Sequence, residues 1–458
     1  MPTHDIVIIG GGTAGLVTAA GAAALGAKAA LIEREALGGD CLWTGCVPSK
    51  ALIAYARKRQ MTGKGTWDDA VAWLRSARTR IAQHDDPERF RGMGVDVILS
   101  PARLAGPGRV EVDGRLLQTK RIVLAMGSSP AVPPIPGLAD VGYLTHVTAF
   151  EHPVLPGSMI MLGGGPIGLE FAQTYARLGA RVTVLEMLPE VLPKEDPEAG
   201  QVIRERLMAE GVTVLTRFHA ARVTRDGTQK VVCGADGERV VADEIFVSAG
   251  RRPNTREAEP ERGGVELDGG AVRVNARLQA TVPGVWAAGD VAGGLQFTHV
   301  AEYMAKVVVQ NALTPLKTRV DYRVVPWVTF TDPEVARVGL TAGEAVAAGE
   351  RVEIYRYGFT DLDRAIADGA TAGFCKVVAR RNGEIRGATI VGRGAGELIM
   401  EFVLAMRHGI RLPALARDIH PYPTMSEIVK RTADGWYRAR YTDTPRGRLL
   451  RRVIRWWL

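Results

Sequence analysis

The sequence predicts an α/β protein with two Rossmann-type dinucleotide-binding domains and a C-terminal α+β domain. A strand, glycine-turn, helix and strand pattern occurs twice, at residues 5–33 and 159–186. After about residue 325 the pattern changes to short strands and two helices. The length of 458 residues also suits about three domains.

The first copy of the repeat begins with the apolar run Asp5–Ile9, which has the length of a buried strand. This run enters the glycine turn Gly10–Gly15 and a helix of small residues, and the next strand, Ala29–Ile32, ends at Glu33. In such a turn the first glycine makes the bend, the second lets the backbone approach a pyrophosphate, and the third lets helix and strand pack closely. The helix N-terminus then faces the phosphates, and the acid accepts hydrogen bonds from a ribose.

The second copy keeps the same order and the same distance from the first glycine to the acid. Met159–Leu162 enters the glycine turn Gly163–Gly168, and a helix follows through Arg177. The strand Val182–Leu185 then ends at Glu186. A single glycine fingerprint is weak evidence, whereas two copies with their strands and acids are strong evidence. A glycine-rich surface loop, the alternative, would predict neither the acids nor the flanking strands.

Two further segments have the form of a buried strand that ends at a glycine, Arg121–Gly127 and Glu244–Gly250, and a third, Gly284–Asp290, is a short strand that ends in Gly-Asp. Four prolines between Pro130 and Pro136 make a stiff connection and a boundary between the two copies.

The C-terminal part has a different pattern of predicted strands and helices. Its predicted antiparallel strands lie at Val335–Val338, Phe374–Val378 and Ile385–Val391, and its predicted helices at Glu397–His408 and Ser426–Tyr437.

A close cysteine pair, Cys41 and Cys46, lies just after the first copy and is followed by Pro48 and Lys50. Pro48 suits the first turn of a helix, and both a helix N-terminus and a nearby cation lower the pKa of a thiol. The pair therefore suits a disulfide that opens and closes. A zinc half-site or two buried free thiols are the alternatives, but the other cysteines, Cys233 and Cys375, are isolated.

Composition fits a globular protein, with 46% apolar and 24% charged residues. A single close cysteine pair in such a length favours catalysis in a reducing compartment, so we expect a cytoplasmic protein; no signal peptide pattern is visible. The net charge is +8, and seven arginines and one acid lie between Arg438 and Leu458. We expect no nucleic-acid binding, because the basic patch is one short tail without a recognition fold.

Together these motifs resemble the FAD-dependent pyridine nucleotide-disulfide oxidoreductases, which include dihydrolipoyl dehydrogenase, glutathione reductase and mercuric reductase. The resemblance extends from Asp5 to about Tyr437. It implies an FAD-binding domain (1–152), an NAD(P)-binding domain (153–280), a second FAD-binding segment (281–324), a dimerisation domain (325–437) and a basic tail (438–458). The implied cofactor-binding residues are Gly10, Gly12, Gly15, Glu33, Gly39, Gly127, Gly289 and Asp290 for FAD, and Gly163, Gly165, Gly168, Glu186 and Gly250 for NAD(P).

The resemblance also implies the path of the electrons in a homodimer. They pass from the nicotinamide through the flavin to the disulfide of Cys41 and Cys46. Cys46 matches the thiol that contacts the flavin, and Cys41 matches the thiol that exchanges with substrate. Lys50 and Glu170 match a lysine–carboxylate pair beside the flavin; an ordinary ion pair in a packed interface is the alternative.

Glu186 bears on the choice of nicotinamide cofactor. A carboxylate at this position favours a free ribose 2′-hydroxyl, so NADH is the expected cofactor. Arg181, Arg251 and Arg252 are nearby in the sequence and leave NADPH open.

The chain departs from the thiol-reducing members at Tyr422, where they carry the histidine that forms an acid–base dyad with the position of Glu427. A phenol with a reference pKa near 10 is a poor base at neutral pH. Mercuric reductase has a tyrosine there too, and a metal–thiolate substrate needs less proton transfer than a disulfide. The mercury resemblance is incomplete, because Arg455–Leu458 contains no cysteine pair to deliver the metal.

Several acceptors therefore stay open. A metal ion or other soft electrophile is the first expectation. A dithiol or disulfide such as lipoamide is the second, with His420 as substitute base; a histidine that only orders its loop is the other interpretation of His420. Direct reduction of a quinone or oxygen by the flavin is the third, and a low-turnover redox sensor the fourth.

The tail from Arg438 to Leu458 carries a separate hypothesis. On a helical wheel, Leu449, Leu450, Val453, Ile454, Trp457 and Leu458 share one face, and Arg448, Arg451, Arg452 and Arg455 share the other. This pattern suits a helix on a membrane surface. Packing on a partner subunit, or a solvated helix, are the alternatives.

Overall fold

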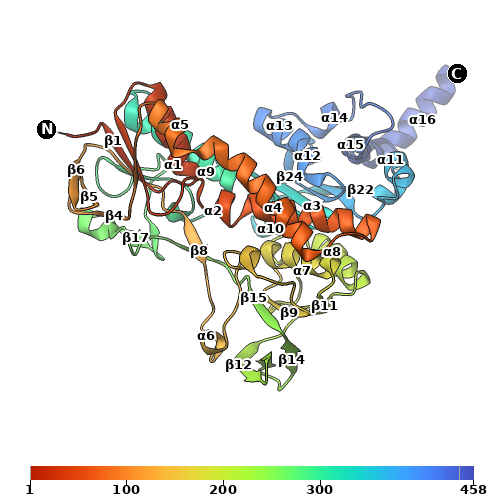
Figure 1. The fold of residues 1–458 in the computed structure, drawn as a ribbon. Coiled ribbons are helices and arrows are strands. Elements are labelled where there is room, and N and C mark those ends of the chain that lie inside the picture. The colour runs from red at the N-terminus through yellow and green to blue at the C-terminus, as the bar shows by residue number, and fades with distance from the viewer. Residues whose placement is uncertain (1, 443) are drawn as a thin grey trace.

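The computed structural model describes residues 2–442 and 444–458, apart from the side chain of Arg446, and contains three main sheets (Figure 1). Two of these sheets are parallel and the third is antiparallel. The predicted fold class is therefore confirmed, while the predicted domain boundaries stay predictions.

The first parallel sheet has the strand order β19-β7-β1-β2-β3. Its strands are β1 (Ile6–Ile9), β2 (Ala29–Glu33), β3 (Asp96–Leu99), β7 (Ile122–Leu124) and β19 (Val285–Ala287). The last strand comes from far along the chain and pairs with β7. This pairing returns the 281–324 segment to the first sheet.

Both faces of this sheet are buried, which explains why β1 is apolar throughout. Ile6 and Ile8 pack beneath helices α1 (Thr13–Ala24) and α9 (Thr298–Leu313). Val7 and Ile9 face the other way, toward a small antiparallel sheet. That sheet consists of β4 (Ala102–Leu104), β5 (Arg109–Val112) and β6 (Arg115–Gln118).

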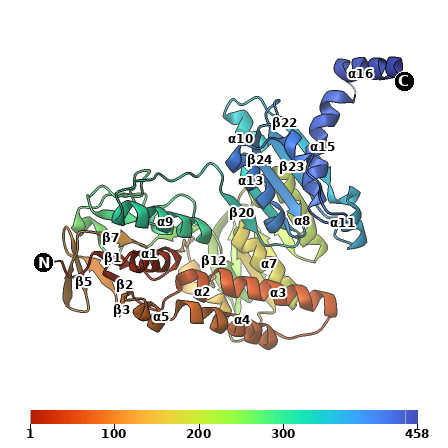
Figure 2. The same cartoon turned by 90° about the horizontal axis from the view of Figure 1, so that it is seen from above.

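Four α-helices lie between β2 and β3: α2 (Gly39–Trp43), α3 (Cys46–Thr62), α4 (Trp67–Ala82) and α5 (Pro87–Gly92). The long helices α3 and α4 extend from the first domain to the second, where they lie beside α7 (Pro166–Leu178) (Figures 1 and 2). Leu52 of α3 and Trp67 of α4 share one apolar cluster with Tyr175 of α7. This packing sets the redox segment against the second domain.

The second parallel sheet has the order β11-β10-β9-β15. Its strands are β9 (Ser158–Leu162), β10 (Arg181–Leu185), β11 (Thr213–Leu215) and β15 (Glu244–Val247). One face is covered by α7 and α8 (Pro197–Ala209). The other face packs on α6 (Leu138–Val141) and on the antiparallel sheet of β12 (Ala220–Asp226), β13 (Gln229–Gly234) and β14 (Arg239–Ala242). A two-stranded ribbon of β8 (Ser128–Pro130) and β16 (Arg251–Pro253) joins the two domains.

The C-terminal sheet has the order β20-β21-β24-β23-β22 and is antiparallel. Its strands are β20 (Pro326–Thr329), β21 (Glu334–Gly339), β22 (Glu353–Gly358), β23 (Phe374–Ala379) and β24 (Ile385–Gly392). Short helices accompany it: α10 (Ala342–Ala347), α11 (Asp363–Ala367), α12 (Ala395–Leu398), α13 (Met400–His408) and α14 (Leu412–Leu415). Two longer helices end the chain, α15 (Glu427–Tyr441) and α16 (Pro445–Trp457).

Two helix predictions differ in detail from the structure. The single helix expected at 397–408 is assigned as α12 and α13, yet Ile399 between them keeps helical backbone angles, with φ −62° and ψ −21°. The helix expected to end at Tyr437 continues to Tyr441, where the neighbouring Arg440 is tied to Glu353 of β22 by a 2.6 Å ion pair.

Candidate active site

The cysteine pair lies where two short helices meet. Cys41 is in α2, and Cys46 is the first residue of α3, after the cap residue Gly45. Both are free thiols here; Cys41 is half-buried and Cys46 is exposed. The Cys46 sulfur lies 3.4 Å from the hydroxyl of Thr298, the first residue of α9. Cys46 thus lies at the start of one helix and against the start of another, and both helix ends favour a thiolate.

The surroundings shift the pKa values of the two thiols in opposite directions. The pKa of Cys46 is lowered to about 6, first because Cys41 donates a hydrogen bond to it, and further because of Thr298 and the charge of Lys50. The pKa of Cys41 is raised well above its usual range, mainly because it donates that hydrogen bond, with burial adding to the effect. Near neutral pH the reduced pair therefore holds its negative charge on Cys46.

Lys50 and Glu170 form the predicted pair, because α3 packs along α7. The Lys50 Nζ donates to Glu170 Oε2 at 2.8 Å, and the Glu170 side chain is 7% exposed. The other carboxylate oxygen accepts the backbone N–H of Phe330 at 2.8 Å. Lys50 Nζ also lies 4.5 Å from the centre of the Phe330 ring. Three segments of the chain thus fix this ion pair one helical turn from Cys46.

A polar network that the sequence did not reveal connects the cysteine segment to the second domain. Asp40, directly before Cys41, accepts a 2.6 Å bond from Arg251 and lies 3.2 Å from the ring nitrogen Nε2 of His146. Arg251 also donates to the hydroxyl of Ser128, which in turn donates to Asp290. Burial alone would raise the pKa of Asp40, but the contact with His146 and the charge of Arg251 hold that pKa well below its usual range.

The two glycine turns have matching geometry. Gly10 and Gly163, the first glycines, have φ of +108° and +113°, a region that other residues avoid. A Cβ on the third glycine would lie 1.8 Å from the carbonyl oxygen of Gly10 in the first copy, and 2.1 Å from that of Gly163 in the second. Only glycine fits at these positions, as the fingerprint predicts.

The second glycine of each turn leaves room for a ligand. A Cβ on Gly165 would meet no atom within 4 Å, and one on Gly12 would meet only the Cα of Gly39, at 3.8 Å. Both residues cap helices that have no side-chain cap and no acid in the first turn. The backbone N–H groups of α1 and α7 are therefore free to bind phosphates, and the residues present fit two dinucleotides.

Each acid that ends a repeat is held in the same way. Glu33 accepts the N–H of Gly11 at 2.6 Å, and Glu186 accepts the N–H of Gly164 at 2.7 Å. In each case the other carboxylate oxygen accepts an N–H two residues further along the chain. These bonds orient both carboxylates and leave acceptor capacity for ribose hydroxyls.

The remaining predicted cofactor residues gather at the same edge of the first sheet. Gly127 follows β7, and Gly289 and Asp290 follow β19, its neighbour in the sheet. Gly250 stands just before β16, which pairs with β8 directly after Gly127. Gly39 lies against Gly12 of the first turn. The assignment of these residues to FAD and NAD(P) contacts stays a prediction.

The C-terminal residues proposed for acid–base chemistry do not join the cysteines within one chain. Tyr422 is 68% exposed and donates to Asp363 of α11 at 3.0 Å. The hydrogen bond to Asp363 and its charge raise the pKa of Tyr422. The elements that flank it, α11 and α15, lie apart from α2 in both views (Figures 1 and 2).

His420 and Glu427 are each engaged elsewhere. His420 Nε2 lies 3.0 Å from Glu401 of α13, and the histidine side chain is 8% exposed. Glu427 is buried at the start of α15, with Arg431 3.4 Å away. The structure brings neither residue into a hydrogen bond with Tyr422.

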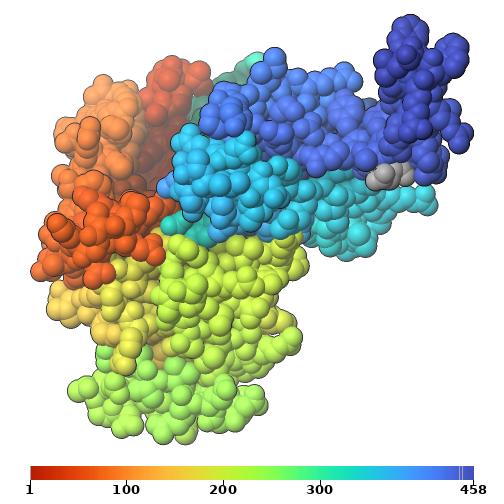
Figure 3. Space-filling model, turned by 90° about the vertical axis from the view of Figure 1, so that its right-hand side faces the viewer, coloured from red at the N-terminus to blue at the C-terminus, as the bar shows by residue number. Residues whose placement is uncertain are grey.

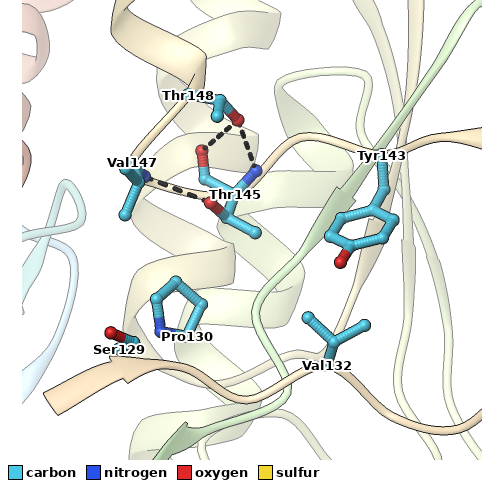
Figure 4. A pocket seen from close by; sticks show the side chains of 7 residues that line it. All are labelled: Ser129, Pro130, Val132, Tyr143, Thr145, Val147 and Thr148. Atoms are coloured by element: carbon cyan, nitrogen blue, oxygen red, sulfur yellow. Dashed lines mark hydrogen bonds between the residues drawn. The ribbon is translucent and has the colours of Figure 1, made fainter. Parts of the chain in front are cut away.

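A pocket of about 470 Å³ lies beside the connection between the domains (Figure 4). Ser129, Pro130 and Val132 line one side of it, and the other side is lined by Tyr143, Thr145, Val147 and Thr148. It contains none of the predicted site residues, so it is separate from the cysteine pair.

Several site residues were missed from the sequence, for different reasons. Asp40 could have been found, because a charged residue directly before a reactive cysteine is a local signal. Thr298, His146 and Arg251 gave no such signal, because they are more than 100 positions from the cysteines.

Neither a metal cluster nor a membrane-spanning helix is found in the part of the chain that the structure covers. No three or more His, Cys, Asp or Glu residues are grouped so that they could hold a metal ion among residues 2–442 and 444–458. No helix in those ranges is long and apolar enough to cross a membrane.

Comparison with known proteins identifies the family of this chain. Residues 4–305 match the family model described as pyridine nucleotide-disulphide oxidoreductase, and residues 325–433 match its dimerisation domain. Dihydrolipoyl dehydrogenase of Thermus scotoductus is 34% identical, covering 96% of this chain and 98% of the relative. Mercuric reductase of Staphylococcus aureus is 33% identical, covering 94% and 82%.

The chain is also similar to a solved structure. The Cu(II) complex of the HOCl-induced flavoprotein disulfide reductase RclA from Escherichia coli has a TM-score of 0.87 at 29% identity, covering 93% of this chain and 98% of the other. The matched dimerisation domain supports a homodimer. With two family models spanning nearly the whole sequence, this chain belongs to the pyridine nucleotide-disulfide oxidoreductases, which use FAD and NAD(P)H.

Proposed function

We propose that the protein is an NADH-dependent reductase that delivers two electrons through Cys41 and Cys46 to a soft metal ion held by thiolates. Tyr422 carries this proposal. It stands where thiol-reducing members have a histidine, and its hydroxyl is tied to Asp363.

The bound FAD and NADH supply two-electron transfer beside the cysteines. The chain itself stabilises a thiolate on Cys46 and leaves Cys41 as the thiol that meets the acceptor. Lys50 and Glu170 keep a fixed positive charge one turn away from Cys46.

The candidate acceptors differ in how much proton transfer their reduction requires. Reduction of a disulfide such as lipoamide requires a group that protonates the leaving thiolate and deprotonates the incoming thiol. A phenol with a raised pKa is a poor base for this step. A metal bound by two thiolates accepts two electrons and releases both thiolates, with no proton needed at the metal. NADH is oxidised to NAD⁺ and H⁺, Hg(II) is reduced to Hg(0), and the released thiolates take up protons from water.

The names of the relatives are divided between a metal and lipoamide, since one relative is a dihydrolipoyl dehydrogenase. One relative is a mercuric reductase, and one structural neighbour was solved as a Cu(II) complex. Lipoamide is the second candidate, because His420 beside Glu401 forms a histidine–carboxylate pair two residues before Tyr422.

NADH is the proposed nicotinamide cofactor. Glu186 is buried and oriented by two backbone N–H groups, so its charge faces the expected ribose and disfavours a 2′-phosphate.

We also propose that the Tyr422 segment meets the cysteines of the other subunit in the homodimer. A reactive dithiol of this kind suits a reducing compartment such as the cytoplasm.

The test is NADH oxidation by the holoenzyme, measured anaerobically with Hg(II) in excess thiol and with lipoamide. We expect metal-dependent turnover and at least about 100-fold slower lipoamide turnover, the size of a missing general base. Tyr422→His should raise the lipoamide rate, whereas Tyr422→Phe should not. Lipoamide turnover equal to metal turnover in the unchanged enzyme would refute the metal proposal. Activity that survives Cys41→Ser would instead favour direct reduction of quinone or oxygen.

A further inference from the structure

Within the described part of the chain, the hydrogen bonds that hold helix α16 to the rest of the protein come from its first half. Thr444 caps it by accepting the N–H of Gly447 at 3.1 Å, and Arg451 donates to the carbonyl oxygen of Thr442 at 2.6 Å. Gly447 is buried against the end of α15, where a Cβ would lie 1.9 Å from the carbonyl oxygen of Tyr441. Beyond this point the helix stands away from the rest of the molecule in the ribbon and space-filling views (Figures 1 to 3).

The exposed surface of α16 is mainly apolar. Trp456 and Trp457 are 85% and 82% exposed. Five other large apolar side chains of this segment are exposed as well: Leu449, Leu450, Val453, Ile454 and Leu458. A group of this size at one end of a protein marks a contact surface.

Charge and apolar side chains divide the helix lengthwise. At about 100° per residue, Arg448, Arg451, Arg452 and Arg455 fall within an arc of about 100°, and the apolar side chains occupy an arc of about 200°. The helix contains no acidic residue. The arginines therefore lie on the side of the helix opposite the apolar face, and the two tryptophans lie near the C-terminal end of the helix.

We propose that α16 binds the surface of an anionic membrane. Its apolar arc would enter the boundary between headgroups and acyl chains, and its arginines would pair with lipid phosphates. The helix has 13 residues and is about 20 Å long at the usual rise, too short to cross a hydrocarbon core of about 30 Å, so it lies along the surface.

Other binding partners fit the surface of α16 less well than an anionic membrane does. A second copy of α16 offers no acid to pair with the arginines, so two copies would bring like charges together. Nucleic acid would satisfy the arginines but leave the apolar arc in water. A homodimer carries two such helices, and binding with both at once strengthens attachment to a surface.

The test is flotation of the holoenzyme with vesicles. We expect binding to an equimolar mixture of phosphatidylglycerol and phosphatidylcholine, little binding to phosphatidylcholine alone, and weaker binding as salt rises from about 0.1 to about 0.5 M. The double variant Trp456→Ser/Trp457→Ser and the triple variant Arg448→Gln/Arg452→Gln/Arg455→Gln should each reduce bound protein at least about tenfold.

Matched controls are available on the same chain. Trp73→Ser removes an exposed tryptophan of α4, and Arg109→Gln/Arg115→Gln/Arg351→Gln removes three exposed arginines outside α16. Both should bind vesicles like the unchanged enzyme, and every variant should keep its flavin and its NADH oxidation.

Three results would overturn the proposal: no flotation with anionic vesicles, equal loss in the controls, or stronger binding to RNA than to vesicles. A change in the assembly mass of the α16 variants without lipid would instead assign the helix to contacts between copies of this chain.

Discussion

Single side chains around Cys46 determine the chemistry of the thiol pair. The Cys46 sulfur lies at a helix N-terminus and accepts a hydrogen bond from Cys41. The Thr298 hydroxyl and the positive charge of Lys50 lie close to it as well. These contacts favour the thiolate, which is the reactive form of cysteine.

The first prediction concerns the pH at which Cys46 becomes reactive. In the reduced protein, alkylation of Cys46 by iodoacetamide should rise with a midpoint near pH 6, because its thiolate predominates above its pKa of about 6. Cys41→Ala removes the hydrogen bond that contributes most, so it should move the midpoint upward toward about 8.5. Lys50→Met should move it in the same direction by less. A midpoint that does not change in Cys41→Ala would contradict this account.

The second prediction concerns Asp40. Its pKa is lowered in the folded protein, so its stabilising contribution is present above the unfolded value of about 4 and is lost as the pH falls through the lower folded value. Asp40→Asn and Arg251→Met should each cost about 1–2 kcal/mol at pH 7, a modest value because Asp40 is partly exposed.

Thermal unfolding of the holoenzyme measures this cost. The destabilisation by Asp40→Asn should shrink progressively below about pH 4. Asp140→Asn, an exposed aspartate in α6, is the matched control and should change little at any pH. An equal cost of Asp40→Asn at acid and neutral pH would rule out the ion pair as its source.

At this scale the sequence was informative where a motif is local. The cysteines, Lys50 and both glutamates that end the repeats could be found from spacing alone. The partners of Asp40 could not, because β16 and the segment after α6 reach it only through the folding of two domains.

Among the elements, the two glycine turns show how one local sequence gives one local structure twice. In both copies the glutamate lies 22 residues after the glycine whose N–H it accepts. Because the two copies match, a substitution of Glu33 in the first copy is a control for the same substitution of Glu186 in the second.

The third prediction uses that control. Glu186→Gln keeps the shape of the side chain but removes the charge that disfavours a 2′-phosphate. The ratio of kcat/KM for NADPH to that for NADH should rise about tenfold, or about 1.4 kcal/mol. Glu33→Gln is the matched change in the first turn and should leave the ratio unchanged when rates are expressed per bound flavin. A ratio that responds equally to both changes would mean that Glu186 does not select the cofactor.

The elements themselves were largely predictable, since apolar runs and glycine turns marked β1, β2, β9 and β10. The boundaries of the C-terminal helices were less so. Sequence also does not show that α3 packs on α7, the contact that places Lys50 against Glu170.

For the whole molecule, the arrangement fits the proposal that the acceptor site is shared by two subunits. The cysteine pair lies between the two parallel-sheet domains, whereas Tyr422 lies on the exposed surface of the C-terminal domain. The proposed acceptor site therefore requires two subunits, and no single-chain pattern predicts which residues face each other across it.

The most direct measurement of the central claim is an anaerobic reductive titration of the oxidised holoenzyme. If Cys41 and Cys46 form a redox pair beside the flavin, the enzyme should take up two electrons for each flavin and two more for the disulfide. Cys41→Ser and Cys46→Ser should each take up only the two of the flavin. An unchanged enzyme that accepts no more electrons than these variants would contradict the account.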